Sequence, residues 1–380
     1  MPNRLFSRRD FSRSLGESLA LAFAAPRWRA PHAIKNWEPP TGAPIRLNYN
    51  ENPYGPSPLA LEALAVSGPV AARYPDQARE QLAAALANYH HVRPENILLG
   101  CGSTEILRAA DMAFLPSGQN LVAAEPTFEA VLEYAGVAHA KAVKFPLTRD
   151  HRHDLPRMAA ACTSKTGLVY VCNPNNPTGT IVTRAELEEF VSRISPTTLI
   201  LVDEAYAHFV EDTSYSSTVG WFSRHPNVLS VRTFSKVYGL AGMRLGYAVG
   251  AAEIIEMMRK QILDDNVNAA VIPAALTALV DTGYVASCRD RLNSSRRWLA
   301  DQLTKGGWRF IPSQANLLMI DAGTDVKPLL AQFEARDILV GRRFASLSNF
   351  LRVTIGTQEE TEAFFAVFKE LVPPKASKAA

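Results

Sequence analysis

Short apolar runs alternate with longer amphipathic stretches along most of this 380-residue chain. Each apolar run is followed by polar residues, as expected of a buried strand, and the runs begin at Ile97, Leu121, Gly167, Leu199, Val228 and Leu245. Between them, apolar residues recur at spacings of three and four, as on the buried face of a helix. This spacing predicts helices over 77–90, 103–115, 184–194, 251–262 and 284–304. The alternation indicates an α/β fold with a mostly parallel sheet.

A second, smaller α/β unit is predicted near the C-terminus. After a further helix at 267–282, the order becomes helix, strand ("NLLMI"), helix and two strands ("ILV" and "FLRVTIG"). A chain of this length fits one large domain and one small one. The predicted division is 1–33 for an N-terminal segment, 34–66 for an arm and the start of the small domain, 67–280 for the large domain, 281–372 for the small domain and 373–380 for a tail.

Composition narrows the class of function. The 40 basic and 37 acidic residues are spread along the chain, and no basic stripe suggests nucleic acid, so a small polar substrate is expected. The four cysteines have neither zinc-site spacing nor the density of a disulfide scaffold, so we predict packing residues or free thiols and no metal. No apolar run reaches the roughly 18 to 20 residues that a membrane span needs.

The first 33 residues form a separate segment with a basic start. It contains the pair Arg8 and Arg9, then Phe11, a weakly apolar stretch over 15–25 and small residues near position 30. This order resembles a twin-arginine export signal, which predicts a periplasmic or otherwise exported protein. The alternative is a basic amphipathic or disordered tail on a cytoplasmic protein, and Glu17 within the apolar stretch keeps that alternative open.

The polar residues that follow the strands are the candidates for a site, because sheets of this kind bind ligands outside the carboxyl ends of their strands. In "GCGSTE", Gly102, Ser103 and Thr104 precede a helix, where free backbone N–H groups favour an anion such as phosphate. The alternative is an ordinary serine cap with Glu105 in the first turn.

Three further segments carry polar residues at strand ends. "NPNNPTG" at 173–179 forces a rigid turn, which either only closes a loop or aims an asparagine amide into a site. Asp203 ends the buried run "LVD", where a carboxylate is costly unless a cation pairs with it. Lys236, in "VRTFSKVYGLAGMRLGY", is by itself most simply a solvated charge.

Together these segments resemble the fold-type I, pyridoxal-phosphate-dependent aminotransferases of class I/II, in the branch similar to histidinol-phosphate aminotransferases. The resemblance runs from about Ile45 to Val372 and rests on "NENPYG", "GCGSTE", "NPNNPTG", "DEAY" and "TFSKVYGLAGMRLGY", in this order, with "LRVTIGT" near the end. It implies a large domain with a mostly parallel sheet and a smaller C-terminal α/β domain.

The resemblance also implies roles around pyridoxal 5′-phosphate. Lys236 would hold the cofactor as a Schiff base, and Asp203 would keep the pyridine nitrogen protonated. Asn176 and Tyr206 would hydrogen-bond the phenolic oxygen of the ring. Phe128 would stack on the ring face, although it could equally be a core aromatic.

The remaining implied roles concern the phosphate, the substrate and a partner subunit. The phosphate would lie among Gly102, Ser103, Thr104, Thr233, Ser235 and Arg244. Tyr54 would reach the neighbouring site of a homodimer. Arg352 would clamp the α-carboxylate of the substrate by paired hydrogen bonds, and Asn316 would line the substrate side. The following histidines fall outside every motif, and for them we expect solvated or packing roles: His90, His91, His151, His153 and His208.

The expected activity is transfer of an amino group between an L-amino acid and a 2-oxo acid, with ping-pong kinetics. The alternatives are a decarboxylase, lyase or oxidase on the same scaffold, a non-enzymatic ligand-binding protein, or a histidinol-phosphate aminotransferase. Members of that last group commonly carry an arginine after the strand equivalent to "ILV", where this chain has Gly341, with Arg342 and Arg343 displaced by one and two residues. We therefore predict a general or specialised amino-acid substrate.

Overall fold

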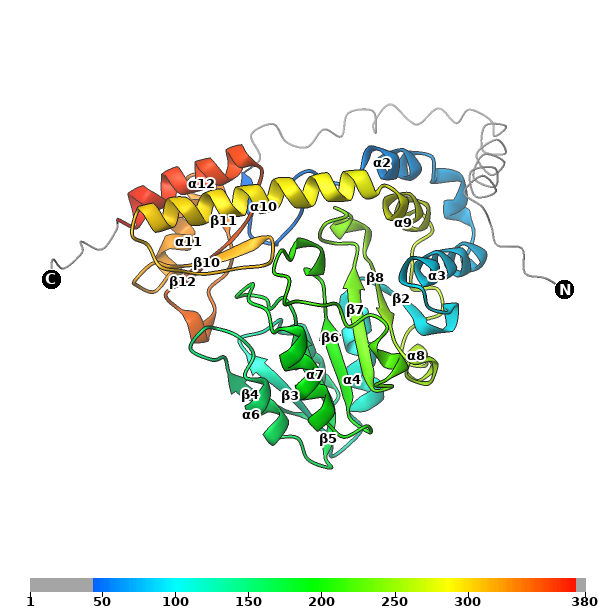
Figure 1. The fold of residues 1–380 in the computed structure, drawn as a ribbon. Coiled ribbons are helices and arrows are strands. Elements are labelled where there is room, and N and C mark those ends of the chain that lie inside the picture. Colours follow the sequence, from blue (N-terminus) through cyan, green and yellow to red (C-terminus); the bar gives the residue numbers. More distant parts are fainter. Residues whose placement is uncertain (1–43, 374–380) are drawn as a thin grey trace.

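The structure is a computed structural model and describes residues 44–373. Its large sheet consists of β2 (Ile97–Cys101), β3 (Asn120–Glu125), β4 (Lys141–Pro146), β5 (Thr166–Cys172), β6 (Leu199–Asp203), β7 (Val228–Thr233) and β8 (Leu245–Val249). The strand order is β2-β8-β7-β6-β5-β3-β4 (Figure 1). Only β8 runs antiparallel to its neighbours β2 and β7, so the predicted mostly parallel sheet is confirmed.

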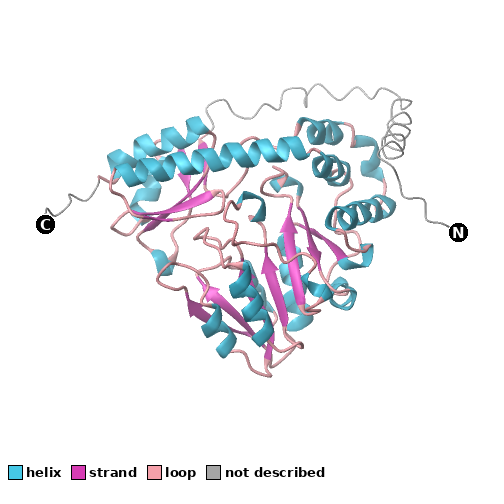
Figure 2. Cartoon of the chain, in the orientation of Figure 1, coloured by secondary structure: helices cyan, strands magenta, loops and turns pink. Residues whose placement is uncertain are grey.

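Two helical layers cover this sheet, because successive side chains of a buried strand point to opposite faces. In β5, Leu168 and Tyr170 pack with the layer of α4 (Ser103–Phe114), α5 (Ala130–Val137) and α8 (Ala252–Arg259). Val169 and Val171 pack with α6 (Leu155–Ala160) and α7 (Arg184–Arg193) on the other face. The result is the three-layered α/β/α arrangement of Figure 2.

The smaller unit is built on a three-stranded antiparallel sheet of β9 (Phe310–Ile311), β10 (Leu317–Asp321) and β12 (Phe350–Thr354). Its helices are α10 (Thr282–Lys305), α11 (Lys327–Glu334) and α12 (Gln358–Leu371). Near the N-terminal end of the described chain, β1 (Ile45–Leu47) pairs in parallel with β11 (Ile338–Val340). This pairing joins the arm to the smaller unit and carries the following residues, 48–52, toward the large sheet.

Three helices pack together beside the large sheet: α2 (Pro58–Ala65), α3 (Asp76–His90) and α9 (Val271–Val280) (Figure 1). Within residues 44–373, no single helix is both long and apolar enough to cross a bilayer. Only α9 and α10 taken as a pair meet those criteria, and they are bent by 79° relative to each other.

The observed elements differ from the predicted ones in bounds and in number, and the elements that were not predicted are α2, α5, α6, α12, β1, β4 and β9. The helix predicted over 251–262 ends at Arg259, and the one predicted over 267–282 begins at Val271. Strand β4 was missed because it lies at the edge of the sheet, where the exposed side chains of Lys141 and Lys144 interrupt any apolar run. The predicted export signal at 1–33 and most of the predicted tail at 373–380 lie outside the described residues, so both stay predictions.

Candidate active site

A cavity of about 740 Å³ opens where the parallel strands of the large sheet end, and the smaller unit forms its opposite wall. Strand ends meet here because β3, β5, β6 and β7 run in the same direction. Eleven of the residues singled out from the sequence line it: Ser103, Thr104, Phe128, Asn176, Asp203, Tyr206, Thr233, Ser235, Lys236, Arg244 and Arg352. Gly102, Tyr54 and Asn316 lie outside the lining.

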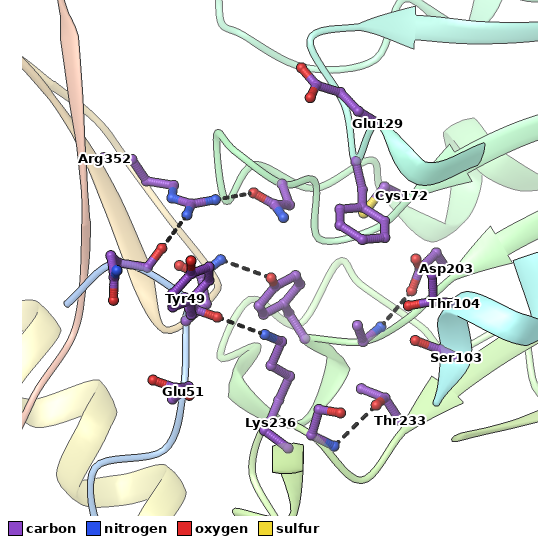
Figure 3. Close-up of a pocket in the computed structure, with 18 of the residues that line it drawn as sticks. Tyr49, Glu51, Ser103, Thr104, Glu129, Cys172, Asp203, Thr233, Lys236 and Arg352 are labelled. Carbon is purple, nitrogen blue, oxygen red and sulfur yellow. Dashed lines mark hydrogen bonds between the residues drawn. The ribbon is translucent and has the colours of Figure 1, made fainter. Parts of the chain in front are cut away.

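Lys236 lies in the turn after β7 and points toward residues 48–52 (Figure 3). Its Nζ donates a hydrogen bond to the main-chain oxygen of Tyr49 at 3.1 Å. Burial, with a smaller contribution from the nearby charge of Arg352, lowers the pKa of Lys236 to about 8. The cavity thus contains an amine that loses its proton readily, which suits both nucleophilic attack and proton transfer.

Asp203 is the last residue of β6, and its side chain is 3% exposed. Its carboxylate accepts hydrogen bonds from Tyr170 Oη at 2.9 Å and from the main-chain N–H of Ala205 at 3.1 Å. Burial raises the pKa of Asp203 to about 6, and the two hydrogen bonds only partly oppose this effect. Because both donors are neutral groups, a cation in the cavity would stabilise the carboxylate further.

An anion site lies where β8 passes the start of α4. Gly102 caps α4 with φ 76°, and a Cβ atom there would lie 2.1 Å from Nη2 of Arg244. Likewise, a Cβ on Gly246 would lie 2.2 Å from the main-chain nitrogen of Ser103. The missing side chains let a guanidinium and the first N–H groups of α4 approach one another, which fits a phosphate group. Hydroxyl groups around this point come from Ser103, Thr104, Thr233 and Ser235.

A chain of polar contacts joins Tyr206 to the smaller unit. Tyr206 Oη accepts a hydrogen bond from Asn50 Nδ2 at 2.9 Å, and Asn50 Oδ1 accepts one from Thr354 Oγ1 at 3.1 Å. Burial raises the pKa of Tyr206, so the phenol keeps its proton and can donate a hydrogen bond into the cavity.

Arg352 projects from β12 into the cavity opposite Lys236 (Figure 3). Its Nη1 donates to Asn176 Oδ1 at 3.0 Å and its Nη2 to the main-chain oxygen of Asn48 at 2.6 Å. Among the residues that the structure describes, its buried Nε has no hydrogen-bond partner. A buried guanidinium without a carboxylate partner is an attractive site for an anionic group of a substrate.

Two of the predicted residues have other surroundings. The ring of Tyr54 packs under the guanidinium of Arg291, at 3.6 Å from Cζ to the ring centroid, so its proposed reach to a neighbouring subunit stays a prediction. Asn316 lies behind the cavity wall and donates from Nδ2 to the main-chain oxygens of Asn50 and Glu51, both at 3.2 Å. It supports the wall and does not line it.

Sequence reasoning missed several lining residues. Asn50 and Glu51 belong to the "NENPYG" motif, which was singled out only for Tyr54, so a signal for them existed. Arg342 was noted only as displaced by one residue from the position of a substrate arginine, yet it lines the cavity. No local signal marks the rest of the wall that the smaller unit supplies, because these apolar residues become neighbours only in the fold: Leu330, Val340 and Phe344. None of the five histidines lines the cavity, and across residues 44–373 no cluster of His, Cys, Asp or Glu could hold a metal ion.

The three-layered fold and the set of Lys236, Asp203 and Arg352 around one cavity define the class of the chain. It belongs to the class I and II aminotransferases, whose family model matches residues 43–368. The chain is therefore an aminotransferase, and its cofactor is pyridoxal 5′-phosphate, as for this family of enzymes.

Individual relatives carry two different names. The chain is 39% identical over 331 residues to the histidinol-phosphate aminotransferase of Moorella thermoacetica, which covers 86% of this chain and 85% of that protein. It is 38% identical over 322 residues to the aromatic amino acid aminotransferase of Rhodococcus jostii, covering 85% of this chain and 88% of that protein.

Among solved structures, the histidinol-phosphate aminotransferase of Sinorhizobium meliloti in complex with pyridoxal-5′-phosphate has the same fold. It superposes with a TM-score of 0.81 and 24% sequence identity, covering 92% of this chain and 99% of that one. This likeness confirms the fold-type I architecture.

Proposed function

We propose that this aminotransferase acts on L-amino acids with large apolar side chains and on the matching 2-oxo acids, and that Arg352 binds their α-carboxylate. The observation that carries the proposal is the buried guanidinium of Arg352, whose Nε has no partner within the described part of the chain. Two neighbours, Asn176 and Asn48, hold the remaining nitrogens in place, so the guanidinium is oriented before any substrate binds.

The side chains around the cavity fit the cofactor. Lys236 would attach it covalently, and the cradle at Gly102 and Arg244 would bind its phosphate. Asp203 would pair with the protonated ring nitrogen, which would supply a positive charge next to the buried carboxylate. When bound, pyridoxal phosphate supplies an electron-withdrawing ring that makes the Cα proton of an attached amino acid acidic.

The remaining steps depend on groups of this chain. The amine of Lys236 would take the proton from Cα of the substrate and return it later in the reaction, a transfer favoured by its lowered pKa. Arg352 would hold the carboxylate and thereby fix which bond at Cα faces the lysine. Tyr206 would donate a hydrogen bond to the phenolic oxygen of the ring. Because one cavity serves amino donor and oxo-acid acceptor in turn, ping-pong kinetics follow.

The distal part of the cavity favours apolar side chains. Tyr49, Leu330, Val340 and Phe344 are among the residues that line the cavity, and the Rhodococcus jostii relative is named for aromatic amino acids. Histidinol phosphate is the second candidate substrate, because the Moorella thermoacetica relative is named for it.

Two observations weigh against histidinol phosphate. A Cβ on Gly341 would lie 2.7 Å from Nε of Arg352, so the position at which that group commonly carries an arginine has no room for a side chain here. Histidinol phosphate also has no α-carboxylate, so the pairing that is proposed for Arg352 would not form with it.

Replacing Arg352 with alanine is expected to lower kcat/KM about 10- to 100-fold for amino acids and 2-oxo acids alike, because both lose a charge-assisted pair worth about 1.5 to 3 kcal/mol. Single-turnover measurement of each half-reaction tests this. The matched control is Arg343→Ala, because Arg343 is exposed and pairs with Asp325 away from the cavity. The proposal would be contradicted if Arg352→Ala kept the wild-type rates of both half-reactions. A preference of the wild-type enzyme for histidinol phosphate would contradict it as well.

We also infer that the enzyme is a homodimer in which a second copy covers the segment 58–74. This segment exposes apolar side chains that a lone subunit leaves in water, with the exposed fractions Leu59 48%, Leu61 50%, Val66 41%, Val70 46% and Tyr74 79%.

The double variant Leu61→Glu with Val70→Glu is expected to run as a monomer in light scattering, where the wild type has the mass of two chains, because two charges would be buried in the interface. The control is Val137→Glu, at an exposed apolar residue at the end of α5. A wild-type mass of one chain would refute the homodimer.

A further inference from the structure

His153 lies just before α6, and its side chain is buried, with 5% exposure. Its ring meets the side-chain amide of Asn175, with Nε2 at 3.1 Å from Oδ1. Asn175 belongs to the turn 173–179 and is fully buried. The structure adds to the packing role expected for this histidine, because its ring contacts the turn that carries Asn176, and Asn176 lines the cavity.

One main-chain oxygen fixes the directions of the hydrogen bonds around Asn175. Its Nδ2 donates to the main-chain oxygen of Pro126 at 3.2 Å, and because a carbonyl can only accept, the amide cannot be turned round. Nδ2 also donates to Thr178 Oγ1 at 3.0 Å, so both amide protons are used. Oδ1 is therefore the acceptor of this side chain, and it accepts from Thr127 Oγ1 at 2.8 Å.

The ring of His153 must then carry its proton on Nε2, because the atom that faces Nε2 can only accept. Nδ1 has no hydrogen-bond partner in the described part of the chain. Burial lowers the pKa of His153 to about 4, and the bond to Asn175 and the main chain of Cys172 oppose this only in part, so the imidazole is neutral at pH 7. The ring is thus held as one tautomer that donates one directed bond to the turn.

Asn175 connects two segments that would contact the cofactor ring. Its amide is tied to Thr127, the residue before Phe128, and Asn176 follows it in the turn. Phe128 and Asn176 both line the cavity. From the cavity side, Asn176 Oδ1 accepts a hydrogen bond from Arg352 Nη1 at 3.0 Å. Asn176 is therefore held from the front by Arg352 and from behind by the residue that precedes it.

Building on the proposed function, we propose that His153 is a positioning residue for Asn176. Its Nε2–H holds the amide of Asn175, and this bond keeps the turn in the place from which Asn176 would reach the phenolic oxygen of the cofactor ring. A bond made behind the site does not touch the ring, but it reduces the freedom that Asn176 loses when the cofactor binds. The effect of His153 should therefore appear in binding of the ring and not in binding of the phosphate.

The test measures binding of two ligands to the cofactor-free enzyme by titration calorimetry: pyridoxine 5′-phosphate, which has the ring and its phenolic oxygen but no aldehyde, and inorganic phosphate. His153→Leu is expected to lower the affinity for pyridoxine 5′-phosphate about three- to tenfold, the usual effect of one neutral hydrogen bond, and to leave that for phosphate within about twofold. His153→Gln should bind both ligands within about twofold of the wild type, because its amide can still donate to Asn175. The control is His225→Leu, at a histidine that packs beside Trp221 and does not line the cavity, and it should change neither affinity.

The tautomer can be observed directly by nuclear magnetic resonance of protein with isotope-labelled histidine rings. The nitrogen signals that disappear in His153→Gln should be those of a neutral ring protonated on Nε2. A ring protonated on Nδ1 alone would overturn the inference, because Nε2 would then have no proton to donate.

A double variant shows whether His153 acts through Asn176. In an Asn176→Ala background, His153→Leu should lower the affinity for pyridoxine 5′-phosphate less than about twofold, because the side chain that it positions is gone. The same loss in both backgrounds, or equal weakening of both ligands, would mean that His153 only supports the fold and that the inference is wrong. If Asn176→Ala weakens binding of pyridoxine 5′-phosphate and His153→Leu does not, this inference alone fails. If Asn176→Ala has no effect, the contact of Asn176 with the phenolic oxygen fails together with it.

Discussion

The Lys236→Ala enzyme is expected to lose at least about 10⁴-fold in kcat, because in the proposed mechanism one amine would supply both the covalent attachment and the proton transfer. The loss should concern chemistry and not folding, since the hydrogen bond that disappears is a single one to the main-chain oxygen of Tyr49. Steady-state assays with an amino donor and a 2-oxo acid measure the rate. Equilibrium dialysis should still find bound cofactor, because the cradle at Gly102 and Arg244 is unchanged.

The control for this variant is Lys305→Ala, at an exposed lysine in the last turn of α10, which should have the wild-type rate. Turnover by Lys236→Ala near the wild-type rate, without an added amine, would refute the role of the lysine. Rescue of part of the rate by added methylamine would support it, because the small amine restores the missing base.

The Asp203→Asn enzyme is expected to turn over at least about 10³-fold more slowly, yet its cofactor-free form should be more stable than the wild type at neutral pH. Burial raises the pKa of Asp203 from 3.8 to about 6, so the folded state binds the proton more tightly than the unfolded state. The free energy of unfolding therefore falls as pH rises from about 4 to 6, by about 3 kcal/mol in all, and stays lowered above pH 6.

An asparagine at this position removes that pH dependence and can still accept the hydrogen bond from Tyr170. We expect the cofactor-free variant to gain about 1 to 3 kcal/mol at pH 7.5 and about half as much at pH 5, where the wild type has lost only part of this stability. Urea unfolding of both proteins at the two pH values measures this, with Asp301→Asn at an exposed position as the control. Equal free energies of unfolding for the two proteins at pH 7.5 would mean that the buried carboxylate of Asp203 does not destabilise the cofactor-free fold.

The residues that could be predicted from the sequence are those whose chemistry conflicts with their local setting. Asp203 ends a buried apolar run, where an unpaired carboxylate is costly, so it demanded an explanation. Lys236 alone did not, and its role was predicted from the resemblance of its segment to the aminotransferase motif. The order of strands and helices could also be predicted, because the local periodicity of apolar residues encodes it. Strand β4 was not predicted, because an edge strand need not be apolar on both faces.

The residues that could not be predicted depend on how distant segments meet. Arg342 and Glu129 form an ion pair although they are separated by 213 residues, and nothing near either indicates the other. The hydrogen-bond partner of Lys236 is the main-chain oxygen of Tyr49. Every residue type has a main-chain oxygen, so the sequence does not indicate this contact. Asn316 was singled out from its motif, and the structure shows its amide bonded to the main-chain oxygens of Asn50 and Glu51 behind the cavity wall.

The chain of contacts through Asn50 has a consequence for the order of events during translation. Asn50 bonds to Tyr206, 156 residues later, and to Thr354, 304 residues later. Lys236 and Asp203 leave the ribosome long before Thr354 and Arg352 do, so a nascent chain can form the large sheet but not the wall that Asn50 and β12 complete. Such non-local contacts form late. The proposed site is therefore incomplete until β12 has been synthesised, and a product of premature termination before Phe350 would contain Lys236 but lack Arg352, the proposed carboxylate-binding residue.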